Sequence, residues 1–335
     1  MTWCQAAGDQ IPVRDSHVSA ILWVLTGDQI FIMCMICETS GYLQHGCNHV
    51  SSSSSSTNKH QILHTFSAPN MSTFDELYTI SRKLGAGGFG SVFKCYSRKT
   101  GQPYAVKFFA DDRVKRRTYC PTSKMDIPDE IALWRNLRHR NIIRYCQHFF
   151  ENGTWIVVME HCSGYKDLFS YVNNRRTPMS ENTAASIISQ TLDAVLYCRS
   201  LKIDHRDIKD ENLLYNPKTK QIKLIDFGSA SLLSPSYNRL QGTDVYHPPE
   251  LFLEGSFKSS DGVVWAIGSL AYILLNGDCP YQTLEDLKND FPIVWTNEKS
   301  SSSARRFVRR ALRRRSVDRE SLSLLKKSAW LQLKN

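Results

Sequence analysis

The stretch His205–Asn212 reads HRDIKDEN and sets two aspartates, a lysine, a glutamate and an asparagine directly before the apolar pair Leu213 and Leu214. A segment this rich in charge is often a solvated turn. It can also be the charged part of a catalytic site, but such a site needs further groups from elsewhere in the chain. The remaining sequence decides between the two interpretations.

A second acidic motif follows at a short interval. Residues 224–228, LIDFG, end an apolar strand with Asp226, which lies nineteen residues after Asp207. The residues between the two motifs, NLLYNPKTKQIKL, predict a hairpin. That hairpin would bring Asp207, Asn212 and Asp226 to one end of the same ribbon, where a carboxylate is well placed to bind a metal ion.

Residues 85–92, GAGGFGSV, fit the pattern G-x-G-x-x-G-x-V. The same glycines occur in dinucleotide folds, but there they open a helix, and an acidic residue follows about twenty positions later. Here a strand follows the glycines, and residues 105–107 are Ala-Val-Lys. We therefore predict a glycine-rich hairpin whose backbone amides lie close over phosphate groups, because glycine has no Cβ.

Lys107 stands among apolar residues in the third predicted strand, so its ammonium needs a partner if the strand is buried. The helical stretch 127–137 offers Glu130, which shares a face with Ile127, Leu133, Trp134 and Leu137. We predict an ion pair between Lys107 and Glu130.

The pattern of elements predicts an α+β domain. From residue 78, short apolar runs separated by turn residues indicate strands in residues 78–84, 91–97, 103–109, 142–150 and 155–161, with one main helix among them. Beyond Gly164, helical patterns dominate in residues 166–175, 180–201 and 259–277, and Ser180 fits an N-cap. We expect a sheet-rich lobe over 74–161, a larger helical lobe over 162–335, and a ligand in the cleft between them.

The ordered set of motifs resembles the eukaryotic protein kinase signature over roughly residues 74–335. Each motif is weak alone, whereas the whole set in this order is very specific. The set comprises Gly85, Gly87, Gly90, Lys107, Glu130, HRD at 205–207, Asn212, DFG at 226–228 and PPE at 248–250.

The resemblance implies a two-lobed kinase fold. It also implies an enzyme that uses Mg²⁺ and transfers the γ-phosphate of ATP to a hydroxyl of a protein substrate. By that resemblance Asp207 accepts or orients the proton of the substrate hydroxyl, and Lys209 steadies the transferring phosphate. Lys107 grips the α and β phosphates, Glu130 orients it, and Asn212 and Asp226 hold two Mg²⁺ ions. The expected ATP site contains Leu84, Gly85, Ala86, Gly87, Gly88, Phe89, Gly90, Val92, Ala105, Lys107, Glu160 and Cys162.

The motifs also indicate a class of kinase. Lys209, two residues after Asp207, and Thr243 in GTDVYHPPE resemble serine/threonine kinases. Within the calcium/calmodulin-dependent kinase group, LIDFGSASLL and VVWAIGSLAYILLNGDCPY resemble PIM kinases, with PAS-domain-containing kinases as the second match. The PIM resemblance implies substrates with arginine upstream of the acceptor, bound by Asp167 and Glu211. We assign Thr243 to the same substrate site.

The activation segment, residues 226–250, has Arg239 as its one basic residue. Arg206 therefore lacks an obvious phosphate-bearing partner, and we expect activity without phosphorylation of this segment. Glu250 is expected to pair with Arg319, as in the family.

Three residues depart from the family pattern. Trp134 is bulky for its place on the helix, Asp204 replaces an apolar residue, and Val263 replaces an aspartate that braces the catalytic loop. In addition, residues 160–164 lack the proline that PIM kinases carry between the lobes. These departures leave a second hypothesis open, namely a pseudokinase or kinase-shaped binding scaffold.

Composition and charge indicate which classes of partner the protein binds. The net charge of +10 comes largely from residues 113–117 and 304–319, which are not interleaved with aromatic residues, so we expect no specific nucleic-acid binding. Ten cysteines without regular spacing indicate reduced thiols and a cytoplasmic or nuclear location. We expect a monomer that binds ATP and protein substrates.

The first 73 residues are predicted to be a low-complexity, disordered extension, because the serine run 51–57 cannot build a core. Asp28 and Gln29 lie at the centre of the apolar stretch 20–37 and argue against a membrane span.

Overall fold

The computed structural model describes residues 21–26, 29–34, 72–87, 90–175, 178–239, 244–281, 283–289 and 292–332. The chain divides into two units, residues 1–66 and 67–335. In the first unit, strands β1 (Ile21–Thr26) and β2 (Gln29–Cys34) form an antiparallel hairpin. Among the described residues, no helix has the length and apolar character that crossing a membrane requires.

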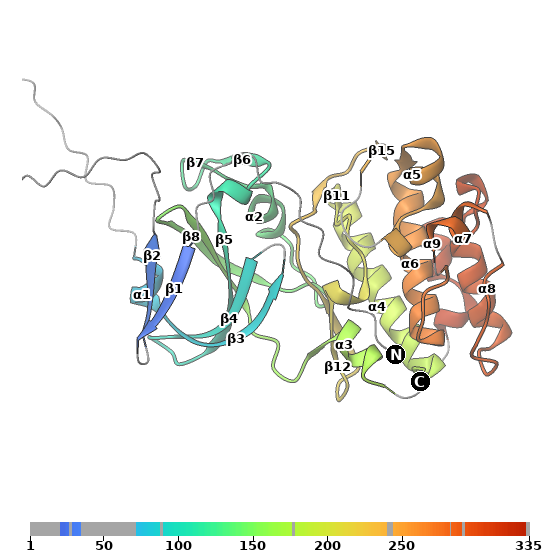
Figure 1. Ribbon diagram of the computed structural model, residues 1–335, viewed down its shortest axis with the longest axis horizontal. Coiled ribbons are helices and arrows are strands. Elements are labelled where there is room, and N and C mark those ends of the chain that lie inside the picture. The colour runs from blue at the N-terminus through green and yellow to red at the C-terminus, as the bar shows by residue number, and fades with distance from the viewer. Residues whose placement is uncertain are drawn as a thin grey trace, which may run out of the picture. The chain divides into compact units, whose positions relative to one another are not determined.

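The second unit begins with a five-stranded antiparallel sheet of order β3-β4-β5-β9-β8 (Figure 1). A one-turn helix, α1 (Phe74–Leu77), precedes it. The strands are β3 (Tyr78–Gly87), β4 (Gly90–Ser97), β5 (Pro103–Ala110), β8 (Tyr145–Glu151) and β9 (Thr154–Glu160). All five predicted strands are therefore confirmed.

The alternation of side chains along β5 places Lys107 on the face of the sheet that packs against the main core of the domain. Val106 and Phe108 pack in an outer cluster with Phe74, whereas Ala105 and Phe109 join the main core of the domain. Lys107 lies between the members of this second pair and shares their face. Its neighbours in the sheet are Val92 on β4 and Val157 on β9.

The predicted helix over 127–137 is shorter than expected. Strands β6 (Arg117–Cys120) and β7 (Met125–Pro128) form a hairpin in which Ile127 pairs with Thr118. The helix α2 (Asp129–Trp134) starts only after Pro128, which serves as the N-cap residue. The apolar face itself is confirmed in part, because Ile127, Trp134 and Leu137 are buried and Leu133 is half-buried; Ile131 joins them.

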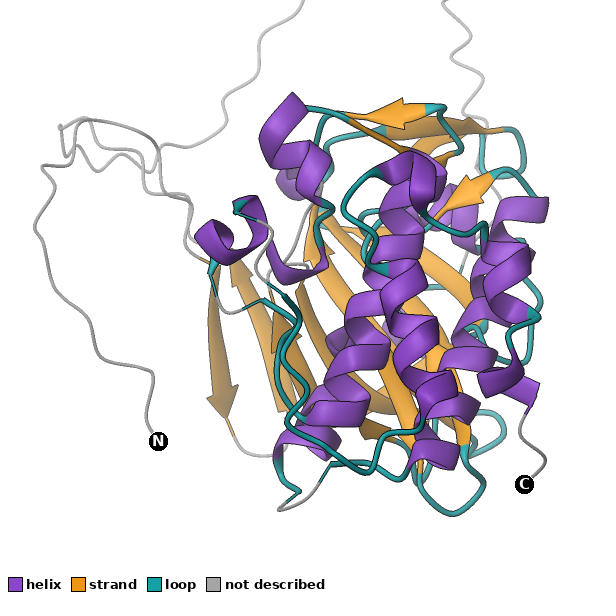
Figure 2. Ribbon diagram, turned by 90° about the vertical axis from the view of Figure 1, so that its right-hand side faces the viewer, coloured by secondary structure: helices purple, strands orange, loops and turns teal. Residues whose placement is uncertain are grey.

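The remainder of the domain is largely helical. The long helices α4 (Glu181–Ser200) and α6 (Ser259–Asn276) are in contact, and Figure 2 shows helices packed beside one another in this part of the chain. Ser180 caps α4 by accepting a hydrogen bond from the Thr183 amide at 3.4 Å, as predicted. The helices are α3 (Leu168–Asn173), α4 (Glu181–Ser200), α5 (Pro249–Glu254), α6 (Ser259–Asn276), α7 (Leu284–Lys288), α8 (Ser302–Ala311) and α9 (Leu322–Lys326).

Short strands fix the loops around the cleft. The predicted hairpin after HRDIKDEN is confirmed as β12 (Leu213–Asn216) and β13 (Gln221–Leu224), and β10 (Lys166–Asp167) adds to its edge. Two further pairs hold the activation segment. They are β11 (Ile203–Asp204) with β14 (Ser231–Leu232), and β15 (Ser236–Tyr237) with β16 (Phe257–Lys258).

The expected ion pair between Glu250 and Arg319 is confirmed. The Arg319 guanidinium donates to both Glu250 oxygens at 2.6 Å, and both side chains are buried. Arg319 also donates to the carbonyls of Arg313 and Asp261, and it lies over the Trp265 ring. The pair thus joins the start of α5 and the middle of α6 to the segment after α8.

We predict that Arg319→Met lowers the free energy of unfolding by about 3–5 kcal/mol, because the Glu250 carboxylate then stays buried without a counter-charge. Arg315→Met is the control, since Arg315 pairs with Asp318 in full contact with solvent. The free energy of unfolding of both variants is measured by chemical denaturation. Equal losses of stability in the two variants would contradict the structural role of the buried pair.

Candidate active site

The Lys107 ammonium lies between two carboxylates. It contacts Glu130 Oε1 on α2 at 2.5 Å and Asp226 Oδ1, just after β13, at 3.0 Å. Burial alone would lower the pKa of Lys107, but the two carboxylates outweigh it and raise that pKa. Lys107 therefore stays charged throughout the neutral range, and the predicted pair with Glu130 is confirmed.

The pKa values of the two carboxylates shift in opposite directions. Burial tends to raise the pKa of Asp226, but the Lys107 charge and the hydrogen bond from the Gly228 amide at 3.1 Å hold it below its usual value. Burial, with the Asp226 charge as a further contribution, raises the pKa of Glu130. Asp226 is thus the more acidic of the two groups and the better prepared to meet a metal ion.

An aromatic column connects the sheet to the catalytic loop. Trp134 on α2 stacks on Phe227 with ring centroids 5.9 Å apart and planes 6° apart, and its edge meets Tyr145 of β8. Phe227 contacts the His205 ring at 4.8 Å. The Trp134 indole N–H donates to the Ile143 carbonyl at 2.7 Å. The bulky residue is therefore accommodated, and it links α2 to the DFG segment.

The loop of residues 205–212 brings Asp207, Asn212 and Lys209 together. Asn212 Nδ2 donates to Asp207 Oδ2 and to the Asp207 carbonyl, both at 2.8 Å. The Lys209 ammonium lies 3.5 Å from Asp207 Oδ2 and 3.3 Å from Glu211 Oε2. Burial would lower the pKa of Lys209, but these carboxylates raise it. An acceptor hydroxyl at Asp207 would thus meet a carboxylate and a cation together.

The donor set fits a magnesium ion. The Asn212 nitrogen faces Asp207, so its amide oxygen remains for a ligand, and Asp226 uses Oδ1 for both of its hydrogen bonds, which leaves Oδ2. Mg²⁺ prefers such oxygen ligands and takes its other ligands from phosphates and water. Among the described residues no group of three or more His, Cys, Asp or Glu side chains could hold a metal ion. With one oxygen each from Asn212 and Asp226, the site suits an ion whose other ligands come from phosphates and water.

A cleft of about 510 Å³ opens beside these groups. Seven of the residues expected at the ATP site line it: Leu84, Gly85, Val92, Ala105, Lys107, Glu160 and Cys162. Sequence reasoning missed several apolar lining residues, although Leu214 and Ile225 directly adjoin the motifs that it used. The missed apolar residues are Trp134, Ile143, Met159, Leu214 and Ile225.

The glycine-rich hairpin is partly described. Gly85 pairs with Val92 across β3 and β4. Gly90 has φ +123°, and a Cβ there would lie 2.2 Å from the Phe108 carbonyl oxygen, so only glycine fits. For Ala86 and Gly87 only the backbone is described, and Gly88 and Phe89 lie outside the described residues.

Of the expected substrate residues, Asp167 lines the cleft. Asp167 pairs with Leu214 across β10 and β12, and its Oδ1 accepts from the Ser170 amide at 2.7 Å as the N-cap of α3. The half-exposed Glu211 contacts Lys209. The helix cap accounts for one Asp167 oxygen and leaves the second for a ligand. Thr243 lies outside the described residues.

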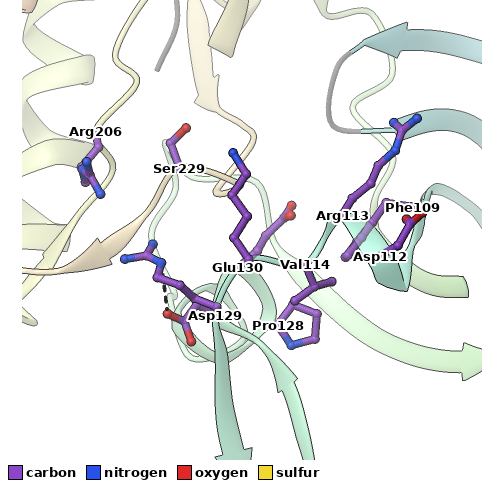
Figure 3. Close-up of a pocket in the computed structure, with 12 residues that line it drawn as sticks. Phe109, Asp112, Arg113, Val114, Pro128, Asp129, Glu130, Arg206 and Ser229 are labelled. Atoms are coloured by element: carbon purple, nitrogen blue, oxygen red, sulfur yellow. Dashed lines mark ion pairs between the residues drawn. The ribbon is translucent and has the colours of Figure 1, made fainter. Parts of the chain in front are cut away.

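A second cavity, of about 490 Å³, shares Glu130 of α2 with this cleft (Figure 3). It is bounded by the segment that follows β5, by the first turn of α2 and by the start of the activation segment. Its wall includes Arg113, Arg116, Asp129, Arg206 and Ser229.

Comparison with known proteins agrees with this geometry. The family model described as protein kinase domain matches residues 78–331. The serine/threonine-protein kinase pim-2 of Danio rerio is 34% identical over 268 residues, which are 77% of this chain and 86% of that protein. Death-associated protein kinase 2 of Mus musculus is 30% identical, over 79% of this chain and 75% of its own length.

The serine/threonine-protein kinase prk-2 of Caenorhabditis elegans is 32% identical over 68% of this chain, and the match covers 51% of its length. The chain belongs to the protein kinase family. It is a protein serine/threonine kinase, with the two-lobed α+β fold of that family and its use of ATP.

We predict that Lys107→Met lowers kcat at least roughly 100-fold, because it removes the cation that meets the phosphates and leaves two buried carboxylates facing each other. Lys99→Met, in the exposed turn after β4, is the matched control and keeps its activity. Phosphate transfer to a peptide and circular dichroism are measured on both proteins. A folded Lys107→Met variant with full turnover would contradict the role of Lys107.

Proposed function

We propose that this kinase is PIM-like and phosphorylates serine or threonine in arginine-rich substrates, without first needing phosphorylation of its own activation segment. The observation that carries the catalytic part is the Lys107 ammonium held between Glu130 and Asp226, at the end of the hairpin that also holds Asp207 and Asn212. The similarity to pim-2 and prk-2 supports the subfamily.

In this proposal each side chain has one task. Asp207 orients the acceptor hydroxyl and takes its proton, while Lys209 offsets the negative charge of the transferring phosphate. Lys107 holds the nucleotide phosphates in position, and Asn212 and Asp226 hold Mg²⁺, which neutralises developing charge when bound. Catalysis then rests on positioning and electrostatics, since phosphoryl transfer needs little covalent help from the protein.

The preference for arginine rests on acidic side chains at the rim. Both β10, which contains Asp167, and α3 contact the turn Asp210–Asn212, which contains Glu211, so the two acids lie on neighbouring segments. A guanidinium can bind a carboxylate through two hydrogen bonds, which makes arginine the basic residue best suited to such a rim.

We predict that Asp167→Asn and Glu211→Gln each lower the preference for arginine about tenfold, because each removes one charge-assisted hydrogen bond. Asparagine still caps α3, so the first variant removes the charge without removing the cap. The measurement is kcat/KM for a peptide with upstream arginines against its alanine counterpart. Asp126→Asn, exposed on β7, is the control. Equal use of both peptides by the unaltered protein would refute the proposed substrate class.

Independence from phosphorylation is supported by the burial of hydroxyls in the activation segment. Ser229 and Ser231 are buried, at 7% and 5% exposure. Phosphorylation of these two serines would first require this part of the activation segment to become exposed to solvent. The two arginines nearest the segment bind backbone carbonyls, since Arg206 donates to Arg239 O at 2.8 Å and Arg116 donates to Ala230 O at 2.6 Å.

We predict that phosphatase-treated protein, shown by mass spectrometry to carry no phosphate on residues 226–250, retains its kcat. The combined change Ser234→Ala and Ser236→Ala, at the less buried serines, should have the same result. Turnover that appears only after phosphorylation of the segment would rule out this part of the proposal.

The remaining parts of the proposal are a monomer, a cytoplasmic or nuclear location and no specific nucleic-acid partner. The basic run 304–319 supports the last point, because several of its arginines have partners within the domain. Arg310 pairs with Glu320 at 2.8 Å, and Arg305 donates to the carbonyls of Ser300 and Glu298.

A further inference from the structure

Asp204 is a buried acid three residues before Asp207. It is 2% exposed and lies on β11, opposite Ser231 of the activation segment. A carboxylate in such a place is costly unless charged and polar groups surround it. Asp204 receives hydrogen bonds from Arg199 at the end of α4, from Ser259 at the start of α6, and from Tyr237 on β15 at 3.0 Å.

The contact from Tyr237 differs from the other two because it comes from the activation segment itself. The Tyr237 hydroxyl donates to Asp204 Oδ2 and accepts from the Ser234 amide at 3.2 Å. It also lies 3.2 Å from the Ser231 hydroxyl. The Tyr237 hydroxyl therefore links the two ends of the segment 231–237 to each other. It also links this segment to Asp204, the residue directly before the HRD motif.

The ring of Tyr237 is fixed as firmly as its hydroxyl. The Arg206 guanidinium lies over it, 4.3 Å from the ring centroid, and the same guanidinium donates to the Arg239 carbonyl. On the other side, Tyr237 approaches Phe257 of β16 with centroids 5.9 Å apart. Arg206 has φ +67°, a conformation that non-glycine residues adopt only when their surroundings hold them there. The Tyr237 ring is one of the contacts that hold Arg206 in this conformation.

We infer that the hydrogen bond between Tyr237 and Asp204 is a positioning contact that holds the activation segment in the form needed for catalysis. The inference rests on the proposed activity without phosphorylation and names the groups responsible. Asp204, itself paired with Arg199, holds the Tyr237 hydroxyl, and the Tyr237 ring in turn lies against the Arg206 guanidinium. Tyr237 and Asp204 act on turnover through Arg206 and the backbone of residues 204–207, without touching a substrate.

The test is Tyr237→Phe, which removes one oxygen and keeps the ring under Arg206. A lost hydrogen bond to a buried carboxylate predicts a fall in kcat of about tenfold. KM for ATP should stay unchanged, because the Lys107 site is not altered. Asp204→Asn keeps an oxygen that can accept from Tyr237 but removes the charge that strengthens this bond and pairs with Arg199, so it should also lower kcat. The double variant should lose less than the product of the two single losses, since both changes weaken the same bond. Tyr197→Phe is the control, because its hydroxyl bonds to the Arg138 amide.

A second measurement does not depend on turnover. Limited trypsin digestion after Arg239 should be faster in Tyr237→Phe than in the unaltered protein and in Tyr197→Phe. Unchanged kcat and unchanged cleavage in a folded Tyr237→Phe protein would overturn the inference, as would losses that multiply in the double variant.

The same digestion separates this inference from the proposed function. If the unphosphorylated protein proves inactive, the proposed independence from phosphorylation fails. Faster cleavage of the unphosphorylated Tyr237→Phe variant would still support the contact, and equal cleavage would refute it.

Discussion

The buried ammonium of Lys107 is the group on which the arrangement of the domain depends. A cation at 6% exposure is tolerable only because two carboxylates reach it, one from α2 and one from the residues after β13. Those carboxylates belong to segments far apart in sequence, so satisfying one charge fixes the sheet, the helix and the DFG segment against one another. The same requirement brings together Lys107, Glu130 and Asp226, which all line the cleft.

Much of this arrangement could be predicted from the sequence because local rules govern it. The hairpin that joins Asp207, Asn212 and Asp226 follows from turn residues between apolar runs, and the partner of Lys107 follows from the need to neutralise a buried charge. The early start predicted for α2 failed, since Ile127 and Pro128 belong to a strand that pairs with β6. Periodicity over so few residues does not separate a helix start from a strand in a hairpin.

Other features depend on contacts between segments that no local pattern relates. Trp134 could be recognised as unusually large, but its stacking on Phe227 needs the three-dimensional position of the DFG segment. Asp204 could be expected to need a partner if buried, yet its partners come from the end of α4, the start of α6 and β15. The apolar lining from Ile143 and Met159 was missed for the same reason, because neither residue belongs to a recognisable motif.

The position of Trp134 also has a practical consequence for spectroscopy. Trp134 lines the cleft and stacks on Phe227, so it adjoins both the cleft and the DFG segment. Indole emission depends on polarity and on stacked neighbours. The intrinsic fluorescence of this kinase thus contains a signal from the wall of its cleft, and comparison with a Trp134→Phe protein would separate that signal from the emission of the other six tryptophans of the chain.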